Sequence, residues 1–167
     1  MALMVENVCK SFGTKLVVDN ICFSCDTPGV FGLIGTNGAG KTTTIRMILG
    51  IMPKDSGKIL WDGKSVTRDN VSFGYMPEER GIYIKNKVRE QLLYFARLNG
   101  MHAADAEKSV DTWLDRLGLS EYADMRAEKL SKGNQQKVQL IACLVHDPEL
   151  IFLDEPFSGL DPINTDI

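Results

Sequence analysis

The sequence lacks the features that are typical of membrane-spanning, secreted and nucleic-acid-binding proteins. No apolar run approaches the ~20 residues that a membrane-spanning helix needs, and the amino terminus lacks the basic and then apolar segments of a signal peptide. The formal net charge of −3 leaves no basic excess that would favour nucleic acid. We therefore expect a cytoplasmic chain of 167 residues with one hydrophobic core and no nucleic-acid partner.

Patterns for metal ions and disulfides are also scarce. The chain has two histidines and four cysteines, and Cys22 and Cys25 alone have C-x-x-C spacing. The surrounding stretch is strand-like, and an offset of three on a strand places the two thiols on opposite faces, so we expect packed thiols and no zinc site. We interpret His102 as a local feature of a loop. We interpret His146 in the same way, at a helix end where a cation is favoured.

What the sequence does contain is a complete phosphate-binding loop. Residues 35–42 read GTNGAGKT, which has the form G-x-x-x-x-G-K-[ST]. The glycines let successive backbone N–H groups turn toward one anion, and the helix that follows adds the positive end of its dipole. Lys41 supplies a positive charge for the β- and γ-phosphates, and Thr42 offers a hydroxyl to Mg²⁺. The residues expected to bind the nucleotide here are Gly35, Asn37, Gly38, Ala39, Gly40, Lys41, Thr42 and Thr43.

The segments on both sides of the loop suit this motif. Residues 30–34 read VFGLI, an apolar run typical of a buried strand. Residues 43–49 have apolar side chains at helical spacing, and Gly50 is suited to end that helix. The sequence thus predicts a strand, the loop and a helix in direct succession.

The remainder of the chain is β-rich first and helical later. We expect strands at 3–25, broken by a turn at 11–14, and at 58–61 and 71–76, with a hairpin-type turn at Asp62 and Gly63. Helical patterns cover 88–98, 103–117 and 133–146, and an apolar strand follows at 150–153. We place Trp113 in the core, because an aromatic on an apolar stripe is most often core. The pattern predicts an α/β nucleotide-binding fold with additional β and α segments.

Two adjacent carboxylates follow the last apolar strand. In open α/β sheets ligands bind at the carboxyl ends of the strands. Asp154 is suited to hold the Mg²⁺ that Thr42 also contacts, and Glu155 is suited to orient or deprotonate the water that attacks the γ-phosphate. Glu155 and Lys41 are therefore candidate catalytic residues.

With these motifs in place, LSKGNQQK at residues 130–137 resembles the signature of the ATP-binding-cassette (ABC) ATPases. The resemblance covers the whole chain and implies a single ABC-type P-loop domain over 1–167, with an N-terminal antiparallel β part and a helical insert at about 88–135. It also implies that Ser131 and Gly133, at a helix N-terminus, reach the γ-phosphate held by a partner subunit. ATP would then lie between the two subunits of a head-to-tail homodimer or heterodimer. A helix N-cap role for Ser131 is the alternative.

Other family positions have counterparts here. Phe12 lies where an aromatic ring stacks on adenine. Glu78 occupies the place of a glutamine that senses Mg²⁺ and the membrane subunit, so it is both a metal and a catalytic candidate. Asp161, in the loop at 158–161, resembles the carboxylate that communicates across the dimer. The segments PEERG and LSKGNQQ together resemble a sodium- and drug-export branch of the family.

In this family a further strand after the position of Asp161 carries a histidine that contacts the γ-phosphate. That strand lies between the strand before the phosphate loop and the strand that ends at Asp154. The chain ends at Ile167, so we expect a domain truncated at its C-terminus, with marginal stability and poor ATP turnover.

The resemblance implies a subunit that binds Mg²⁺ and ATP, hydrolyses ATP, and powers a multi-span membrane subunit from the inner face of the cell membrane. Two alternatives remain. One is a regulatory protein of the same fold, in which ATP acts as a switch. The other is a truncated fragment that binds nucleotide without hydrolysing it.

Overall fold

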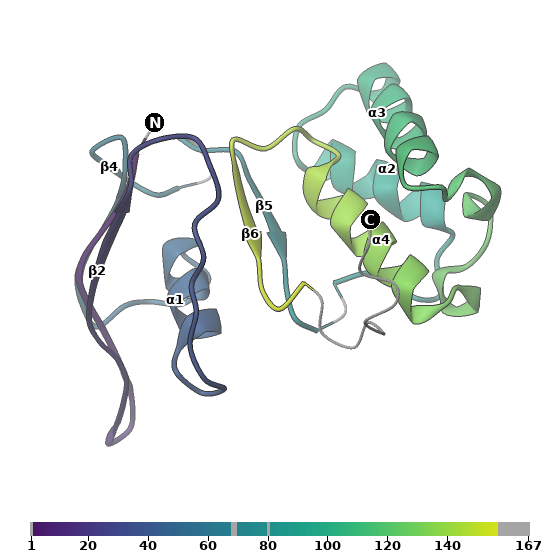
Figure 1. The fold of residues 1–167 in the computed structure, drawn as a ribbon. Helices are drawn as coiled ribbons and strands as arrows, with labels where there is room; N and C mark the ends of the chain where they lie inside the picture. Colours follow the sequence, from purple (N-terminus) through teal and green to yellow (C-terminus); the bar gives the residue numbers. More distant parts are fainter. Residues whose placement is uncertain (1, 68–69, 80, 157–167) are drawn as a thin grey trace. The chain divides into compact units, whose positions relative to one another are not determined.

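The computed structural model describes residues 2–67, 70–79 and 81–156 (Figure 1). The chain divides into two compact units, residues 1–71 and residues 72–167, here called the N-terminal and the C-terminal unit. Each is described by itself. The prediction of a single domain over the whole chain stays a prediction.

The N-terminal unit is built on an antiparallel sheet. Its strands are β1 (Leu3–Phe12), β2 (Lys15–Cys25), β3 (Ser56–Trp61) and β4 (Lys64–Ser65), in the order β2-β1-β3-β4. β1 and β2 are joined by a tight turn that places Phe12 opposite Lys15. The turn between β3 and β4 is formed by Asp62 and Gly63, both at positive φ (47° and 77°), which is the backbone that tight hairpin turns require. Both predicted turns are confirmed.

One face of this sheet forms the core of the N-terminal unit. Leu3, Val5 and Val8 of β1 are at most 3% exposed. The helix α1 (Lys41–Ile48) contacts β2 and contributes further buried apolar side chains. These are Ile45, Met47 and Ile48. The helix predicted after the phosphate loop is therefore confirmed.

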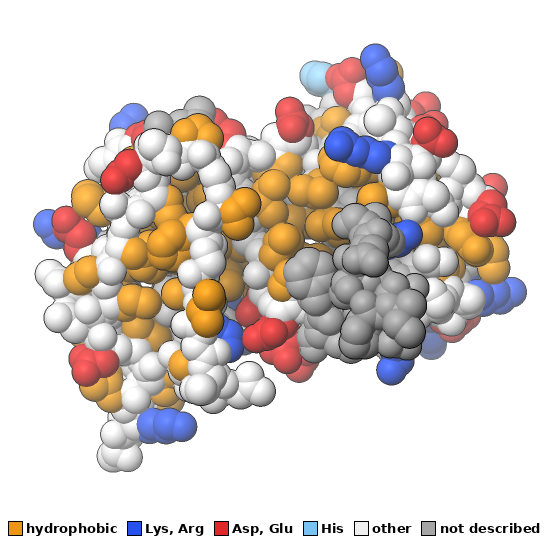
Figure 2. All heavy atoms as spheres, viewed as in Figure 1, with side chains coloured by type: hydrophobic (Ala, Val, Ile, Leu, Met, Phe, Trp, Pro, Cys, Tyr) orange, Lys and Arg blue, Asp and Glu red, His pale blue; other side chains and the backbone are white. Residues whose placement is uncertain are grey.

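Residues 30–34 differ from the prediction. They form no strand, and Val30 and Ile34 are 103% and 95% exposed. Phe31 stacks on Phe23 of β2, with the ring centroids 4.8 Å apart. Figure 2 shows hydrophobic side chains on the surface of this unit. A strand forms only where a neighbour supplies hydrogen bonds, and no strand that the structure describes pairs with this run. The prediction of a buried strand here is wrong for this structure.

The C-terminal unit pairs a short parallel sheet with helices. β5 (Phe73–Met76) runs parallel to β6 (Leu150–Leu153), with Phe73 opposite Leu150 and Met76 opposite Leu153. The helices are α2 (Val88–Leu98), α3 (Ala103–Arg116) and α4 (Lys132–Leu144), with short 3-10 turns η1 (Ser120–Tyr122) and η2 (Ala127–Lys129). The predicted helices and both strands are confirmed within a few residues. Among the described helices, none has the length and apolar character of a membrane span.

The helices enclose their own hydrophobic core. Trp113 is half-buried and packs against this core, and the Arg116 guanidinium lies 5.0 Å from its ring centroid, so the core interpretation of Trp113 is confirmed in part. The side chains that form the centre of the core are Val88, Leu92, Ala96, Val110, Leu114, Val138 and Ile141. The helical unit is thus stabilised by apolar stripes that face one another.

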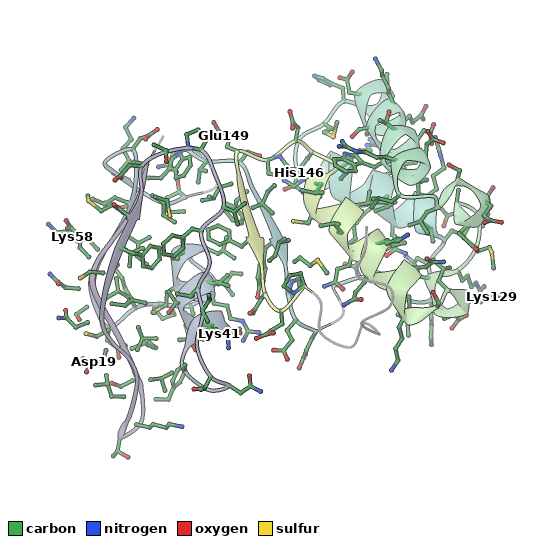
Figure 3. The ribbon with its side chains drawn as sticks, viewed as in Figure 1. Asp19, Lys41, Lys58, Lys129, His146 and Glu149 are labelled. Atoms are coloured by element: carbon green, nitrogen blue, oxygen red, sulfur yellow. The ribbon has the colours of Figure 1, made fainter. Side chains whose placement is uncertain are left out.

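The isolated cysteines and histidines take part in local contacts. Cys22 and Cys25 are free thiols, and Cys25 is half-buried, whereas Cys22 is exposed and is therefore not the packed thiol that the sequence predicted. The described residues contain no cluster of three or more metal-ligating side chains. His146 lies just after α4, with Nε2 3.2 Å from the Phe73 carbonyl oxygen (Figure 3). Burial lowers the pKa of His146, which favours the neutral imidazole and not the cation expected at a helix end.

Candidate nucleotide-binding site

The phosphate loop forms a compact turn directly before α1. Gly38 and Gly40 have φ of 81° and 88°, a left-handed backbone that favours glycine. The Ala39 N–H donates to the Thr36 carbonyl at 3.2 Å, and the Thr44 N–H donates to the Gly40 carbonyl at 2.8 Å, which starts the helix. The loop thereby presents the first turn of α1, with its positive dipole end, at the place predicted for the phosphates.

Gly40 lies against β2 as well as preceding α1. A Cβ on Gly40 would lie 2.8 Å from the Val17 carbonyl oxygen and 2.9 Å from Val18 Cγ2. Neither contact is tolerable for a real Cβ atom, so glycine is required here by packing as well as by the backbone angle. The end of the phosphate loop is thus held against β2.

We expect Gly40→Ala to lower the free energy of unfolding by more than about 2 kcal/mol and to weaken ATP binding, because it combines left-handed strain with steric overlap. Gly63→Ala is the matched control, since Gly63 has a similar φ of 77° and a Cβ added there would meet no atom within 4 Å. Chemical denaturation measures both losses. Equal losses in the two variants would show that contact with β2 contributes nothing.

Lys41 folds back over the loop that precedes it. Its Nζ donates to the Gly35 carbonyl oxygen at 2.8 Å and to that of Thr36 at 3.3 Å (Figure 3). The ammonium group therefore already lies at the loop, where phosphate oxygens can replace carbonyl oxygens as its acceptors. Thr42 and Thr43 follow in the first turn of α1 and are half-buried.

Phe12, the candidate adenine platform, ends β1 and is 47% exposed. Lys10 Nζ lies 5.7 Å from its ring centroid and also pairs with Asp55 at 2.7 Å. The hydrogen bond from Lys10 and the one from the Ser11 N–H lower the pKa of the Asp55 carboxyl. Asp55 therefore holds the end of β1, next to Phe12, through its hydrogen bonds with Lys10 and Ser11. Its role could not be predicted, because nothing in the local sequence links Asp55 to a strand 44 residues earlier.

The acidic pair lies directly after β6. Asp154 is 3% exposed, and its N–H donates to the Met76 carbonyl at 2.9 Å, which continues the pairing of β6 with β5. Glu155 is exposed and has a φ of 52°. A left-handed backbone in a non-glycine residue costs about 1–3 kcal/mol and is found preferentially at functional sites. The two neighbouring carboxylates thus have different surroundings, as their different expected roles require.

Glu78 lies on the same edge of the parallel sheet as Asp154. It is exposed and follows β5 by two residues, whereas Asp154 directly follows β6. Because parallel strands end at a common edge, the structure brings these two metal candidates to one edge. The backbone beside Glu78 is held by Gln139 of α4, whose Nε2 donates to the carbonyls of Pro77 and Glu79. No motif in the sequence pointed to Gln139.

The signature segment begins α4. Ser131 is the N-cap, and its Oγ accepts a hydrogen bond from the Asn134 N–H at 3.2 Å. The N-cap role is therefore confirmed. As the N-cap, the Ser131 hydroxyl acts as an acceptor. It can also donate its own proton to another group, because a serine hydroxyl both donates and accepts. Gly133 lies in the first turn. Asp161 and its loop fall outside the described residues.

The predicted site residues thus belong to two units. Phe12, the phosphate loop, Thr42 and Thr43 lie in the N-terminal unit. Glu78, Ser131, Gly133, Asp154 and Glu155 lie in the C-terminal unit. Their assembly into one site stays a prediction.

Known proteins resemble this chain over most of its length. The ABC transporter family model matches residues 18–158. An uncharacterized ABC transporter ATP-binding protein of Bacillus subtilis is 49% identical over 99% of the chain and 56% of its own length. The linearmycin resistance ATP-binding protein of the same organism is 37% identical over 96% of the chain and 53% of its own length.

A solved ATP-binding subunit of an ABC transporter is 31% identical and superimposes with a TM-score of 0.85, over 98% of this chain and 70% of the solved one. The chain spans about half the length of the curated relatives it matches. The fold expected from the sequence, a P-loop ATPase of the ABC type with an antiparallel β part, is confirmed. With a family model that matches more than half of its residues, the chain belongs to the ABC transporter family.

Proposed function

We propose that the chain is the ATP-binding and ATP-hydrolysing subunit of a membrane transporter. The main observation behind this proposal is the phosphate loop. Lys41 donates hydrogen bonds to the loop carbonyls, and the N-terminus of α1 follows the loop directly. Backbone N–H groups, a helix dipole and an ammonium group all favour a polyphosphate at one place.

In this proposal the oxygen donors hold Mg²⁺. Thr42 offers a hydroxyl, and Asp154 and Glu78 offer carboxylates at one edge of the β5–β6 sheet. Hydroxyl and carboxylate oxygens are the ligands that Mg²⁺ takes, so the donor set fits this ion. When bound, the ion neutralises the charge that develops on the β- and γ-phosphates.

Glu155 accepts a proton from the attacking water in the proposed reaction. The water oxygen forms a bond to the γ-phosphorus, the bond to the bridging oxygen breaks, and ADP leaves with that oxygen. The exposed carboxylate of Glu155 and its strained backbone support this role, because such strain persists where it serves a site.

Ser131 and Gly133 serve a second nucleotide in this proposal. They lie at the N-terminus of α4, a position that favours an anion, and Ser131 is exposed. We propose that they contact the γ-phosphate bound by a second ABC subunit, so that two subunits close head to tail around ATP. Phe12 would stack on adenine, and the paired subunits would act on a membrane protein from the cytoplasmic face.

The test is a calorimetric titration of the chain with ATP, with Mg²⁺ present and then with Mg²⁺ removed by EDTA. We expect saturable binding at one site per chain that weakens at least about tenfold without the ion, because charge-assisted contacts to the phosphates depend on it. Co-purification with a multi-span membrane protein tests the transporter assignment separately. ATP binding without any such partner would favour the regulatory alternative, and absence of ATP binding would contradict both.

A further inference from the structure

One stripe along α4 contacts the backbone of β5 and of the loop that follows it. Cys143 packs so closely on Gly74 that a Cβ there would overlap the Cys143 carbonyl oxygen and sulfur. Gln139 lies four residues earlier, and His146, which contacts Phe73, lies three residues later. The spacing of four places Gln139 and Cys143 on one side of α4, and His146 follows just after the helix. The stripe therefore follows the chain from Phe73 to the residues around Glu78.

Gln139 contacts the chain on both sides of Glu78. Its Nε2 donates to the Pro77 carbonyl oxygen at 2.7 Å and to the Glu79 carbonyl oxygen at 3.2 Å. Gln139 is only 7% exposed, whereas Glu78 is exposed. One buried amide thus holds the backbone on both sides of Glu78 and leaves the carboxylate open to solvent. A side-chain amide is suited to this, because its NH₂ group carries two donors.

A second glutamine of α4 holds the other acidic segment. Gln136 Nε2 donates to the Pro156 carbonyl oxygen at 3.3 Å, directly after Glu155. The helix α4, capped by Ser131, therefore carries amides bound to the backbone beside both Glu78 and Glu155. The same helix therefore contacts both acidic segments through side-chain amides.

We propose that Gln139 is a positioning residue that sets the place of the Glu78 carboxylate relative to the signature helix α4. The proposal rests on the role of Glu78 in the proposed function. Gln139 touches neither nucleotide nor metal in this proposal. It acts through the carbonyl groups of Pro77 and Glu79, and couples contact at the N-terminus of α4 to the metal-facing edge of the β5–β6 sheet.

The test compares Gln139→Met with Gln91→Met in the full-length protein. Methionine keeps the length of glutamine and removes the donors. Gln91 is the matched control, because it is a buried glutamine of the same unit, 1% exposed, whose amide binds the backbone at Tyr83, Asn86 and Lys87. We expect Gln139→Met to lower kcat roughly tenfold and to raise the Mg²⁺ concentration for half-maximal turnover, with the KM for ATP changed less than about twofold. Gln91→Met should reduce thermal stability without altering the Mg²⁺ dependence.

A double-mutant cycle with Glu78→Gln separates positioning from general loss of structure. If Gln139 acts through Glu78, Gln139→Met should change kcat little once Glu78 has been replaced. An equal fall in kcat in both backgrounds, or a Mg²⁺ dependence shifted equally by Gln91→Met, would overturn the proposal.

The carbonyl carbon chemical shifts of Pro77 and Glu79 provide a readout that does not need catalysis. Because these two carbonyl oxygens accept the hydrogen bonds of Gln139, we expect both signals to move in Gln139→Met and to be unchanged in Gln91→Met. If the parent chain binds or hydrolyses no ATP, the proposed function fails, while the chemical shifts still decide whether Gln139 holds this segment. Unchanged shifts in Gln139→Met would contradict the contact itself.

Discussion

Replacing Lys41 with alanine is expected to weaken Mg-ATP binding at least about tenfold, equivalent to about 1.5–3 kcal/mol for a charge-assisted hydrogen bond. The Lys41 ammonium already lies over the loop, bonded to the carbonyls of Gly35 and Thr36. Its removal takes a positive charge and a hydrogen-bond donor away from the place predicted for the phosphates, which weakens binding. Isothermal calorimetry with Mg-ATP measures this effect.

Lys54→Ala is the control for Lys41→Ala. Lys54 is an exposed lysine of the same unit, so its loss changes the net charge equally without touching the phosphate loop. We expect its ATP affinity to match that of the parent chain. Equal affinities of the parent and Lys41→Ala chains would contradict the assignment of this loop as the phosphate site.

Replacing Glu155 with glutamine is expected to preserve ATP binding and to lower turnover by about 10²-fold or more, because the amide keeps the shape of the side chain but cannot accept a proton. The same variant should accumulate an ATP-bound dimer, since the step that lets the subunits separate is blocked. Steady-state phosphate release and size-exclusion chromatography with ATP measure the two outcomes.

Glu149→Gln provides the matched control at the opposite end of β6, where the carboxylate accepts a hydrogen bond from the Ser72 N–H (Figure 3). It should leave turnover unchanged. Asp154→Asn should instead weaken the Mg²⁺ dependence of binding, because Asp154 is the buried carboxylate of the pair. Parent-level turnover in Glu155→Gln would mean that another residue positions the water, with Glu78 the first candidate.

The helices and turns could be predicted because their signals are local. The helical stripes of α2, α3 and α4 come from spacings of three and four, and the turn at Asp62 and Gly63 comes from residues that tolerate positive φ. The phosphate loop belongs to the same class, since its glycines and the start of α1 lie within eight residues. Marginal stability and poor turnover of the chain stay predictions.

Contacts between distant segments could not be predicted in this way. Gln139 reaches carbonyls 62 and 60 residues away, and Asp55 binds Ser11 across 44 residues. The residues next to Gln139 and Asp55 in the sequence form no motif that would indicate these contacts. Their roles follow from the fold that brings the segments together.

By itself, the sequence determined the phosphate loop, the acidic pair after an apolar strand, the capped start of α4 and hence the family, because each of these is a pattern of adjacent residues with its own backbone preference. Tertiary structure alone decided which apolar runs become strands. Residues 150–153 pair with β5 as β6, whereas the equally apolar residues 30–34 form no strand in the part of the chain that the structure describes. The reason is that a strand, unlike a helix, satisfies its backbone hydrogen bonds only through a neighbour supplied from elsewhere in the chain.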